Sequence, residues 1–151
     1  SRLMSKLTAD TFWQFACDVY SKNSVQPLLL ELQDEQQKNV NLCLLLMFLD
    51  SLKLKLTPTQ FSALDNAAAL SDAQLLNPHR LTRKNLKTHH AHRTDYAVIR
   101  KQLLENELAL EKLQQSLLLD ALPSSISVNN GADNLALYLS EQDKNRLFQC
   151  L

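Results

Sequence analysis

The sequence predicts an all-α fold, a single-domain bundle of six or seven helices around one buried helix. The chain has 151 residues, about the size of one domain. It contains one glycine and four prolines, and it is rich in Leu, Ala, Gln, Glu and Lys, which lose little conformational freedom in a helix. Residues 42–49 are all apolar, a pattern typical of a helix that other helices enclose. The buried central helix is therefore expected at about residues 41–54.

Capping residues and apolar spacing predict the helices that precede and include this central helix. Thr8 or Asp10 can cap a first helix, in which apolar residues recur at helical spacing as far as Tyr20. A second helix is expected over about residues 25–36. Asn41 can cap the central helix by accepting from its free backbone amides.

The next helix has the clearest start in the chain. Thr57 is a cap residue, Pro58 occupies the first helical position, and Gln60 stands at the capping-box position. This helix is expected to run to about Leu70. Residues 71–72 can then cap a further short helix.

The second half of the chain is predicted to contain a break, a long helix and a tail. Pro78 is expected to end or kink the short helix, because proline lacks the N–H that a helix interior needs. The longest helix is expected from Asp95 to about Ala121. The bundle domain would then occupy residues 1–122. Residues 123–151 would form a polar tail with one short C-terminal helix, at about residues 134–141.

Charge is balanced overall but uneven along the chain. Sixteen Lys and Arg residues match sixteen Asp and Glu residues, so no overall charge attracts nucleic acid or a membrane. We call residues 80–101 the basic block, because cations dominate this segment. RNA binding could use the four cations at its start, which are Arg80, Arg83, Lys84 and Lys87. The block contains one aromatic residue, Tyr96, and so lacks a platform for stacking bases.

The expected location is the cytoplasm, without membrane contact. The three cysteines have no metal-ligand spacing, and two of them lie in apolar helical patterns. No signal segment is visible, and the apolar run at residues 42–49 is far shorter than the roughly 20 residues of a membrane helix.

Several charged residues are predicted to meet inside the bundle. Glu107 falls within the apolar stripe of the long helix, where an unpaired carboxylate would be costly. Arg80, Arg83 and Lys87 share one helix face at spacings of three and four. They could pair with Glu107, with Glu111 or with Asp34, for which a cationic partner is expected. Such residues either form internal ion pairs that fix helix register or line a pocket for an anionic or amide-bearing ligand.

Evidence for catalysis or for a bound metal is weak. His89 and His92 lie one turn apart if helical, but no cysteine or carboxylate pair stands nearby at ligand spacing. No phosphate-binding loop or nucleophile motif is present in the sequence. We therefore expect no metal and no cofactor, and a non-enzymatic role is favoured.

Short motifs in a fixed order also indicate a family. They are Phe12-Trp13-x-Phe15-Ala16, Leu32-Gln33-Asp34, Val40-Asn41-Leu42, Pro78-x-Arg80-x-x-Arg83 and Glu107-x-x-x-Glu111. Together they resemble an uncharacterised proteobacterial domain-of-unknown-function family of small helical proteins, over roughly residues 10–119. The chain departs from the family pattern near Ser24 and Lys38, where glycine is expected, and at His79, where leucine is usual. The resemblance implies a helical cytoplasmic protein without an assigned activity.

Three functional hypotheses follow. The favoured one is a helical interaction or adaptor protein of the bacterial cytoplasm, with another protein as its partner. The first alternative is a ligand-binding or enzymatic bundle with a polar pocket between helices, and the second is an RNA-associated protein that uses the basic block. The candidate pocket residues are Trp13, Tyr20, Gln33, Asp34, Asn41, Arg80, Arg83, Lys87, Glu107 and Glu111.

Overall fold

The computed structural model describes residues 2–151 and is predominantly helical. Over these residues there are seven α-helices and one two-stranded sheet. The helices are α1 (Ala9–Tyr20), α2 (Val25–Gln36), α3 (Val40–Ser51), α4 (Pro58–Ser71), α5 (Asn77–His90), α6 (Tyr96–Asp120) and α7 (Glu141–Gln149), and the strands are β1 (Leu54–Lys55) and β2 (Ser127–Val128). The predicted all-α single domain is confirmed.

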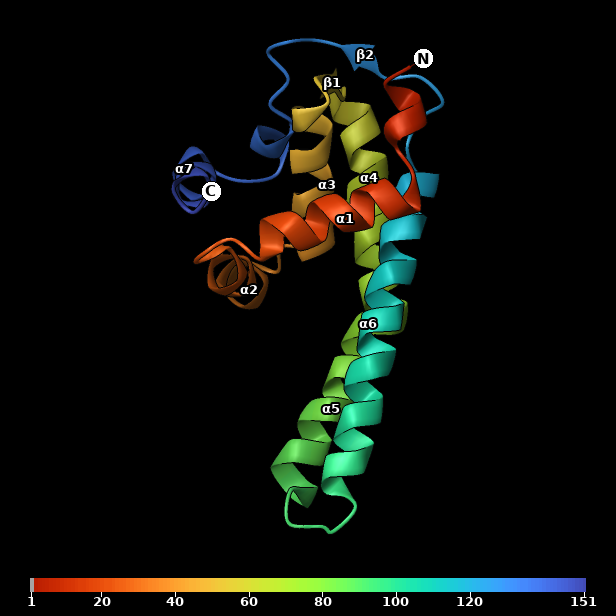
Figure 1. Cartoon of the computed structure of the whole chain (residues 1–151), viewed down its shortest axis with the longest axis vertical. Coiled ribbons are helices and arrows are strands. Elements are labelled where there is room, and N and C mark those ends of the chain that lie inside the picture. Colours follow the sequence, from red (N-terminus) through yellow and green to blue (C-terminus); the bar gives the residue numbers. More distant parts are fainter. Residues whose placement is uncertain (1) are drawn as a thin grey trace.

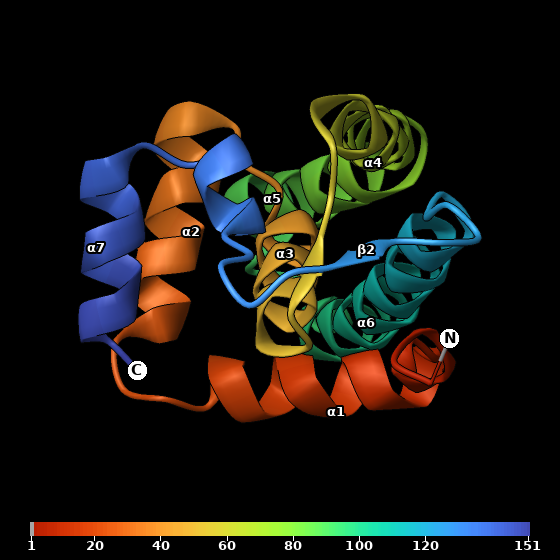
Figure 2. The same ribbon diagram turned by 90° about the horizontal axis from the view of Figure 1, so that it is seen from above.

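Helix α3 is the buried centre of the molecule. Figure 2 shows it among α1, α2, α4 and α6, and every residue from 41 to 49 is buried. The cap is Asn39, whose side chain accepts from the Leu42 amide at 2.8 Å, so the prediction that Asn41 caps this helix is wrong. The helix also ends at Ser51 rather than near residue 54, because Lys53 adopts a positive φ of 58° and the chain then enters β1.

The chain does not leave the helix at Pro78, so the first of the two predicted outcomes there, a helix end, is wrong. Helix α4 begins as expected, with the Thr57 cap and the Gln60 capping box. The chain then stays helical through a π-helical turn at Asp72–Leu76 and continues into α5. Ser71 does not cap a helix, because its hydroxyl donates back to the Ala67 carbonyl at 2.8 Å. Pro78 has no backbone N–H group to donate to the preceding turn. The π-helical turn, in which the hydrogen-bond spacing differs from that of an α-helix, lies directly before the segment that contains Pro78.

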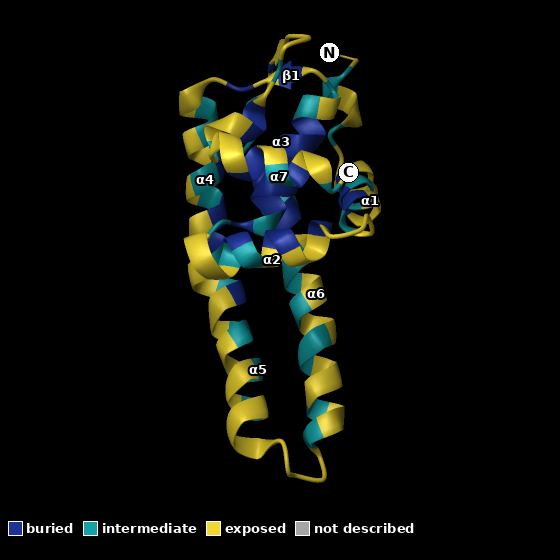
Figure 3. Cartoon of the chain, turned by 90° about the vertical axis from the view of Figure 1, so that its left-hand side faces the viewer, coloured by how far each residue is buried: buried dark blue, intermediate teal, exposed yellow. Residues whose placement is uncertain are grey.

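Helices α5 and α6 form a long antiparallel arm. Figure 1 shows the arm projecting away from the other helices, and Figure 3 shows that most of its outer part is exposed. The C-terminal half of α6 instead packs against α1, α3 and α4. Within residues 2–151, no helix has both the length and the apolar composition needed to cross a membrane.

The segment after residue 122 packs against the bundle. It contributes Ile126, Leu135, Leu139 and Leu147 to the hydrophobic core, and β2 pairs with β1. The short helix expected at residues 134–141 is wrong in extent. A 3-10 helix covers only Asn134–Leu137, and the longer α7 follows it.

Candidate functional site

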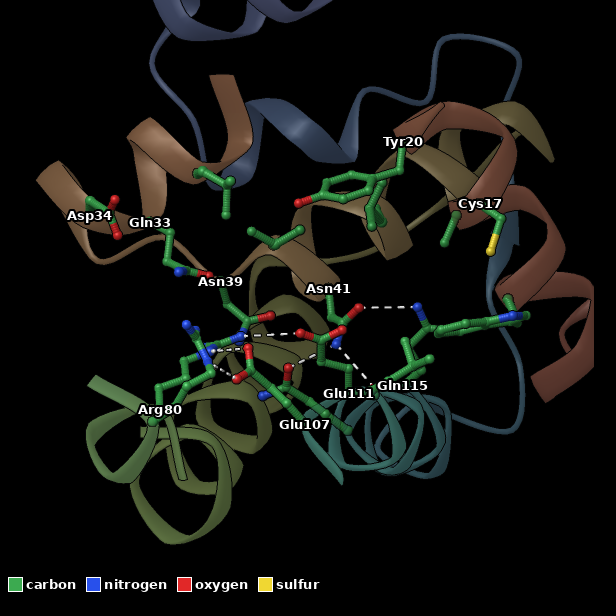
Figure 4. A pocket seen from close by; sticks show the side chains of 18 of the residues that line it. Cys17, Tyr20, Gln33, Asp34, Asn39, Asn41, Arg80, Glu107, Glu111 and Gln115 are labelled. Carbon is green, nitrogen blue, oxygen red and sulfur yellow. Dashed lines mark hydrogen bonds and ion pairs between the residues drawn. The ribbon is translucent and has the colours of Figure 1, made fainter. Parts of the chain in front are cut away.

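A pocket of about 460 Å³ lies where α1, α2, α3, α5 and α6 meet (Figure 4). Nine of the ten candidate residues line it, and Lys87 lies on the exposed surface of α5 outside it. The nine are Trp13, Tyr20, Gln33, Asp34, Asn41, Arg80, Arg83, Glu107 and Glu111. Spacing along single helices thus selected residues that the fold gathers in one place.

One wall of the pocket carries ion pairs between α5 and α6. Arg83 Nε lies 2.8 Å from Glu107 Oε1, and Arg80 Nε lies 3.6 Å from Glu107 Oε2. Arg80 Nη2 also lies 3.7 Å from Glu111 Oε1. The Glu107 side chain, only 12% exposed, is therefore paired with two guanidinium groups, as its place in the apolar stripe predicts.

The cationic partner expected for Asp34 is absent. Among residues 2–151, no cation lies within ion-pair distance of its carboxylate. The side chain is exposed near the end of α2, where water can solvate it. Arg80 and Arg83 face α6, because Glu107 and Glu111 on that helix are the carboxylates that they contact.

A chain of side-chain amides runs through the buried end of the site. Gln114 donates from Nε2 to Asp72 Oδ1 at 2.8 Å and accepts from Asn41 Nδ2 at 2.9 Å. Asn41 Oδ1 in turn accepts from Gln115 Nε2 at 3.0 Å. We call this set, Asp72, Gln114, Asn41 and Gln115, the amide relay.

The direction of the amide relay is fixed at two points, Asp72 and Asn41. An ionised carboxylate can only accept, so Asp72 forces Gln114 to present its NH₂ group. Asn41 Nδ2 also donates to the Glu111 backbone carbonyl at 3.2 Å, which fixes the orientation of Asn41. The last oxygen of the relay, Gln115 Oε1, is then left as an acceptor, and within residues 2–151 it is buried without a hydrogen-bond partner.

Tyr20 and Glu111 are two more polar groups at the pocket, and neither is held tightly. Figure 4 shows Tyr20 and Gln33 across the pocket from Arg80 and Glu107. Burial raises the pKa of Tyr20, the Glu111 carboxylate raises it further, and Arg80 opposes the shift. Burial also raises the pKa of Glu111, and Glu107 adds to this effect while Arg80 acts against it. The closest cation to the Glu111 carboxylate lies at 3.7 Å.

The remaining wall is apolar and includes a thiol. Trp13, Leu44 and Leu108 line the pocket, and Lys112 Nζ lies 4.5 Å from the centre of the Trp13 ring. Cys17 is exposed and also lines the pocket. A ligand with an apolar part and a polar head could contact both kinds of wall.

Sequence reasoning missed Gln115 and Cys17 as site residues. It included Asn41 among the pocket candidates, but it also expected Asn41 to cap α3, a role that Asn39 has instead. Gln114 and Glu111 lie beside Glu107 along one edge of the apolar stripe of α6, and this row of polar residues was the available signal for the relay. No local pattern could show that Gln114 meets Asn41, because these two residues are far apart in the chain and lie on different helices.

The histidines do not gather into a metal site. His89 and His92 are exposed, at the end of α5 and in the turn that follows. Across residues 2–151, no group of three or more His, Cys, Asp or Glu side chains could hold a metal ion. His79 lies apart from them, with its Nε2 atom 2.7 Å from the Leu103 carbonyl oxygen.

The fold and the site define a helical-bundle protein with a polar pocket between its helices. The chain belongs to the family described as "Protein of unknown function (DUF2390)", whose model matches residues 11–118. The resemblance seen in the sequence motifs is thereby confirmed at the level of the family. Comparison with curated proteins and with solved structures found no match.

Proposed function

We propose that this protein binds a small polar molecule in the pocket between α1, α2, α3, α5 and α6. The observation that carries the proposal is Gln115, a residue that lines the pocket and whose buried Oε1 atom has no hydrogen-bond partner within residues 2–151. Buried polar atoms are nearly always hydrogen-bonded, so such an atom calls for a donor from outside the chain. The volume, about 460 Å³, lies in the range of small-molecule sites, roughly 300 to 1,000 Å³.

The pairing of charges supports binding rather than a reaction. Arg80, Arg83 and Glu107 satisfy one another, and neither Cys17 nor Tyr20 has a hydrogen-bonded base among the described residues. Nucleophilic catalysis needs a base within hydrogen-bond reach of the nucleophile. We therefore assign the pocket to ligand binding rather than to catalysis.

Cys17 allows a direct test. The purified native protein is treated with iodoacetamide, and the modification of each cysteine is followed by mass spectrometry. Cys43 serves as an internal control, because burial raises its pKa to about 12 and so keeps the thiol unreactive while the protein is folded. Small molecules that are released by denaturing the native protein are returned to stripped protein. We expect one of them to slow alkylation of Cys17.

A matched variant separates pocket occupancy from general protection. Gln115→Leu removes the unpartnered acceptor, so it should abolish the protection of Cys17 by the same molecule. Cys150, which lies outside the pocket, should be alkylated at the same rate with and without the molecule. If no released or added molecule protects Cys17, the proposed function is wrong.

A second candidate function is interaction with another protein through the α5–α6 arm, in the bacterial cytoplasm. Leu81 and Val98 on this arm are 58% and 62% exposed, and exposed apolar side chains of this size can mark contact sites. All three cysteines are free, as a reducing compartment would require. Removing both apolar side chains by Leu81→Ser and Val98→Ser should abolish capture of a specific partner from a native lysate. Capture that persists would contradict this function.

A further inference from the structure

We propose that the inner end of the pocket binds a protonated amino or guanidino group of the ligand. This inference rests on the proposed function, and it identifies the chemical class of the group that meets Gln115. Gln115, Glu111 and Tyr20, from α1 and α6, all line this pocket and each carries an acceptor oxygen, and Gln115 Oε1 is the buried one without a partner among the described residues.

The unpartnered atom of the amide relay disfavours an anion at this end. Gln114 and Asn41 each donate from their NH₂ groups to two or more acceptors, whereas Gln115 donates one N–H to Asn41. Among residues 2–151, the relay atom left without a hydrogen-bond partner is an oxygen, Gln115 Oε1. A carboxylate or phosphate placed against Gln115 Oε1 would face a buried acceptor and gain no hydrogen bond.

The positions of the cations agree with this polarity. Arg83 is committed to Glu107 at 2.8 Å, and Arg80 contacts Glu107 at 3.6 Å and Glu111 at 3.7 Å. Lys84 is exposed on the same helix. Arg80, Arg83 and Lys84 all belong to α5, whereas Gln115 lies on α6, one turn beyond Glu111. The cations thus line the α5 side of the pocket, and Arg80 is the one that reaches a carboxylate of the acceptor side, Glu111, at 3.7 Å.

Glu111 makes a charged donor preferable to a neutral one. Its side chain is 34% exposed, and its only ion-pair contact among the described residues is the long one to Arg80. An ammonium group between Glu111 and Gln115 would gain a charge-assisted hydrogen bond in addition to satisfying the buried oxygen. A neutral amide could satisfy the oxygen but would gain less from the carboxylate.

Hexylamine, hexanamide and hexanoate test the inference, because they share an apolar body that can lie against Trp13 and Leu44 and differ only in the head group. Binding is measured by calorimetry and by protection of Cys17 from iodoacetamide. We expect hexylamine to bind about tenfold or more tightly than hexanamide. Hexanoate should give no protection.

Substitution of Glu111 provides the second measurement. Glu111→Gln keeps the shape of the side chain and leaves the relay intact, because the relay uses the backbone carbonyl of Glu111. It should weaken hexylamine binding by about tenfold and leave hexanamide binding nearly unchanged. The matched control is Glu105→Gln, on the exposed side of α6 with only a 4.0 Å contact to Lys101, which should change neither affinity.

The outcomes separate this inference from the proposed function. If hexanoate protects Cys17 as well as hexylamine does, or if Glu111→Gln leaves hexylamine affinity unchanged, the pocket binds small molecules but the amine assignment is wrong. If an endogenous molecule protects Cys17 and hexylamine does not, the assignment is also wrong. If nothing protects Cys17, the proposed function fails and the inference fails with it.

Discussion

Gln114 Nε2 donates to Asp72 Oδ1 over 2.8 Å, and this contact sets the orientation of the amide groups that follow it. The second oxygen of the same carboxylate accepts from Asn39 Nδ2 at 2.8 Å, and Asn39 in turn caps α3. Asp72 lies in the π-helical turn between α4 and α5. The irregular turn thus presents one carboxylate to both the cap of the central helix and the relay that ends at the pocket.

Asp72→Asn should destabilise the protein. An asparagine has one acceptor oxygen in place of two. Gln114 Nε2 also donates to Ser71 Oγ at 2.9 Å, whereas Asn39 Nδ2 has no second acceptor among the described residues, so Asn39 is the donor that would face an NH₂ group. We expect the free energy of unfolding to fall by about 1 to 3 kcal/mol, the cost of leaving a buried polar group unpaired. Urea denaturation followed by circular dichroism measures the change. Asp65→Asn on α4 is the control, because the Asp65 side chain has no hydrogen bond or ion pair within residues 2–151. Equal stability of the two variants would refute the role of Asp72.

Arg83→Met should also lower stability, whereas Lys84→Met should not. Without Arg83, the Glu107 carboxylate keeps only the longer contact with Arg80 at 3.6 Å, although its side chain is just 12% exposed. Because Arg83 is itself partly exposed, we expect a moderate loss of about 1 to 2 kcal/mol in the free energy of unfolding. Lys84 is exposed and has no acidic partner among the described residues. A loss of similar size in Lys84→Met would show that the cost comes from the helix surface rather than from the ion pair.

The sequence was most informative where one local signal determines one structure. Residues 57–60 combine a cap, a proline and a capping-box glutamine, and α4 begins there. The cap of α3 was misplaced because Asn39 and Asn41 are both acceptable cap residues. Asn41 comes two residues after the cap, so it lies within the helix, where its buried side chain joins the relay.

Longer-range contacts account for the parts that could not be predicted. Helix α7 is mostly polar and has only two apolar residues, Leu147 and Phe148, so it shows little apolar pattern in the sequence, and distant partners hold it in place. Asp143 accepts from Gln36 at 3.0 Å, and Arg146 contacts Glu31 at 2.7 Å. The ion pairs of Arg80 and Arg83 with Glu107 were foreseeable from helical spacing. The relay was not, because it depends on which faces of α3 and α6 meet.

Glu111 should make stability and amine binding respond to pH in opposite directions. Burial raises the pKa of its carboxyl group above the ordinary value of 4.5. The folded state then binds the proton more readily than the unfolded state, so this group adds stability as pH falls from neutral through its raised pKa towards 4.5. The groups that act on it are Arg80 and Arg83 from α5, Glu107 on α6 and Tyr20 from α1.

The measurement compares the protein with Glu111→Gln from pH 7 to pH 4.5. Relative to the variant, the unaltered protein should gain free energy of unfolding over this interval, while its affinity for hexylamine should fall as Glu111 takes up a proton. The affinity of the variant should vary less with pH. Parallel pH curves for the two proteins would exclude Glu111 as the titrating group.

Asn134→Ala should show whether the segment after residue 122 is part of the same cooperative unit as the bundle. The Asn134 side chain donates to Asp50 Oδ1 and to the Leu54 carbonyl, both at 2.7 Å, and accepts from the Leu56 amide at 2.8 Å. Its own backbone amide donates to the same Asp50 oxygen at 2.6 Å. Because the side chain is buried, its removal leaves the Leu56 amide and the Leu54 carbonyl without these partners, and we expect a loss of about 2 to 4 kcal/mol in the free energy of unfolding.

Asn130→Ala, at an exposed position of the preceding turn, is the matched control and should cost less than about 0.5 kcal/mol. Urea unfolding should remain a single transition in both variants. A separate early transition for Asn134→Ala would mean that residues 123–151 detach independently, and the bundle of residues 1–122 would then be stable without them.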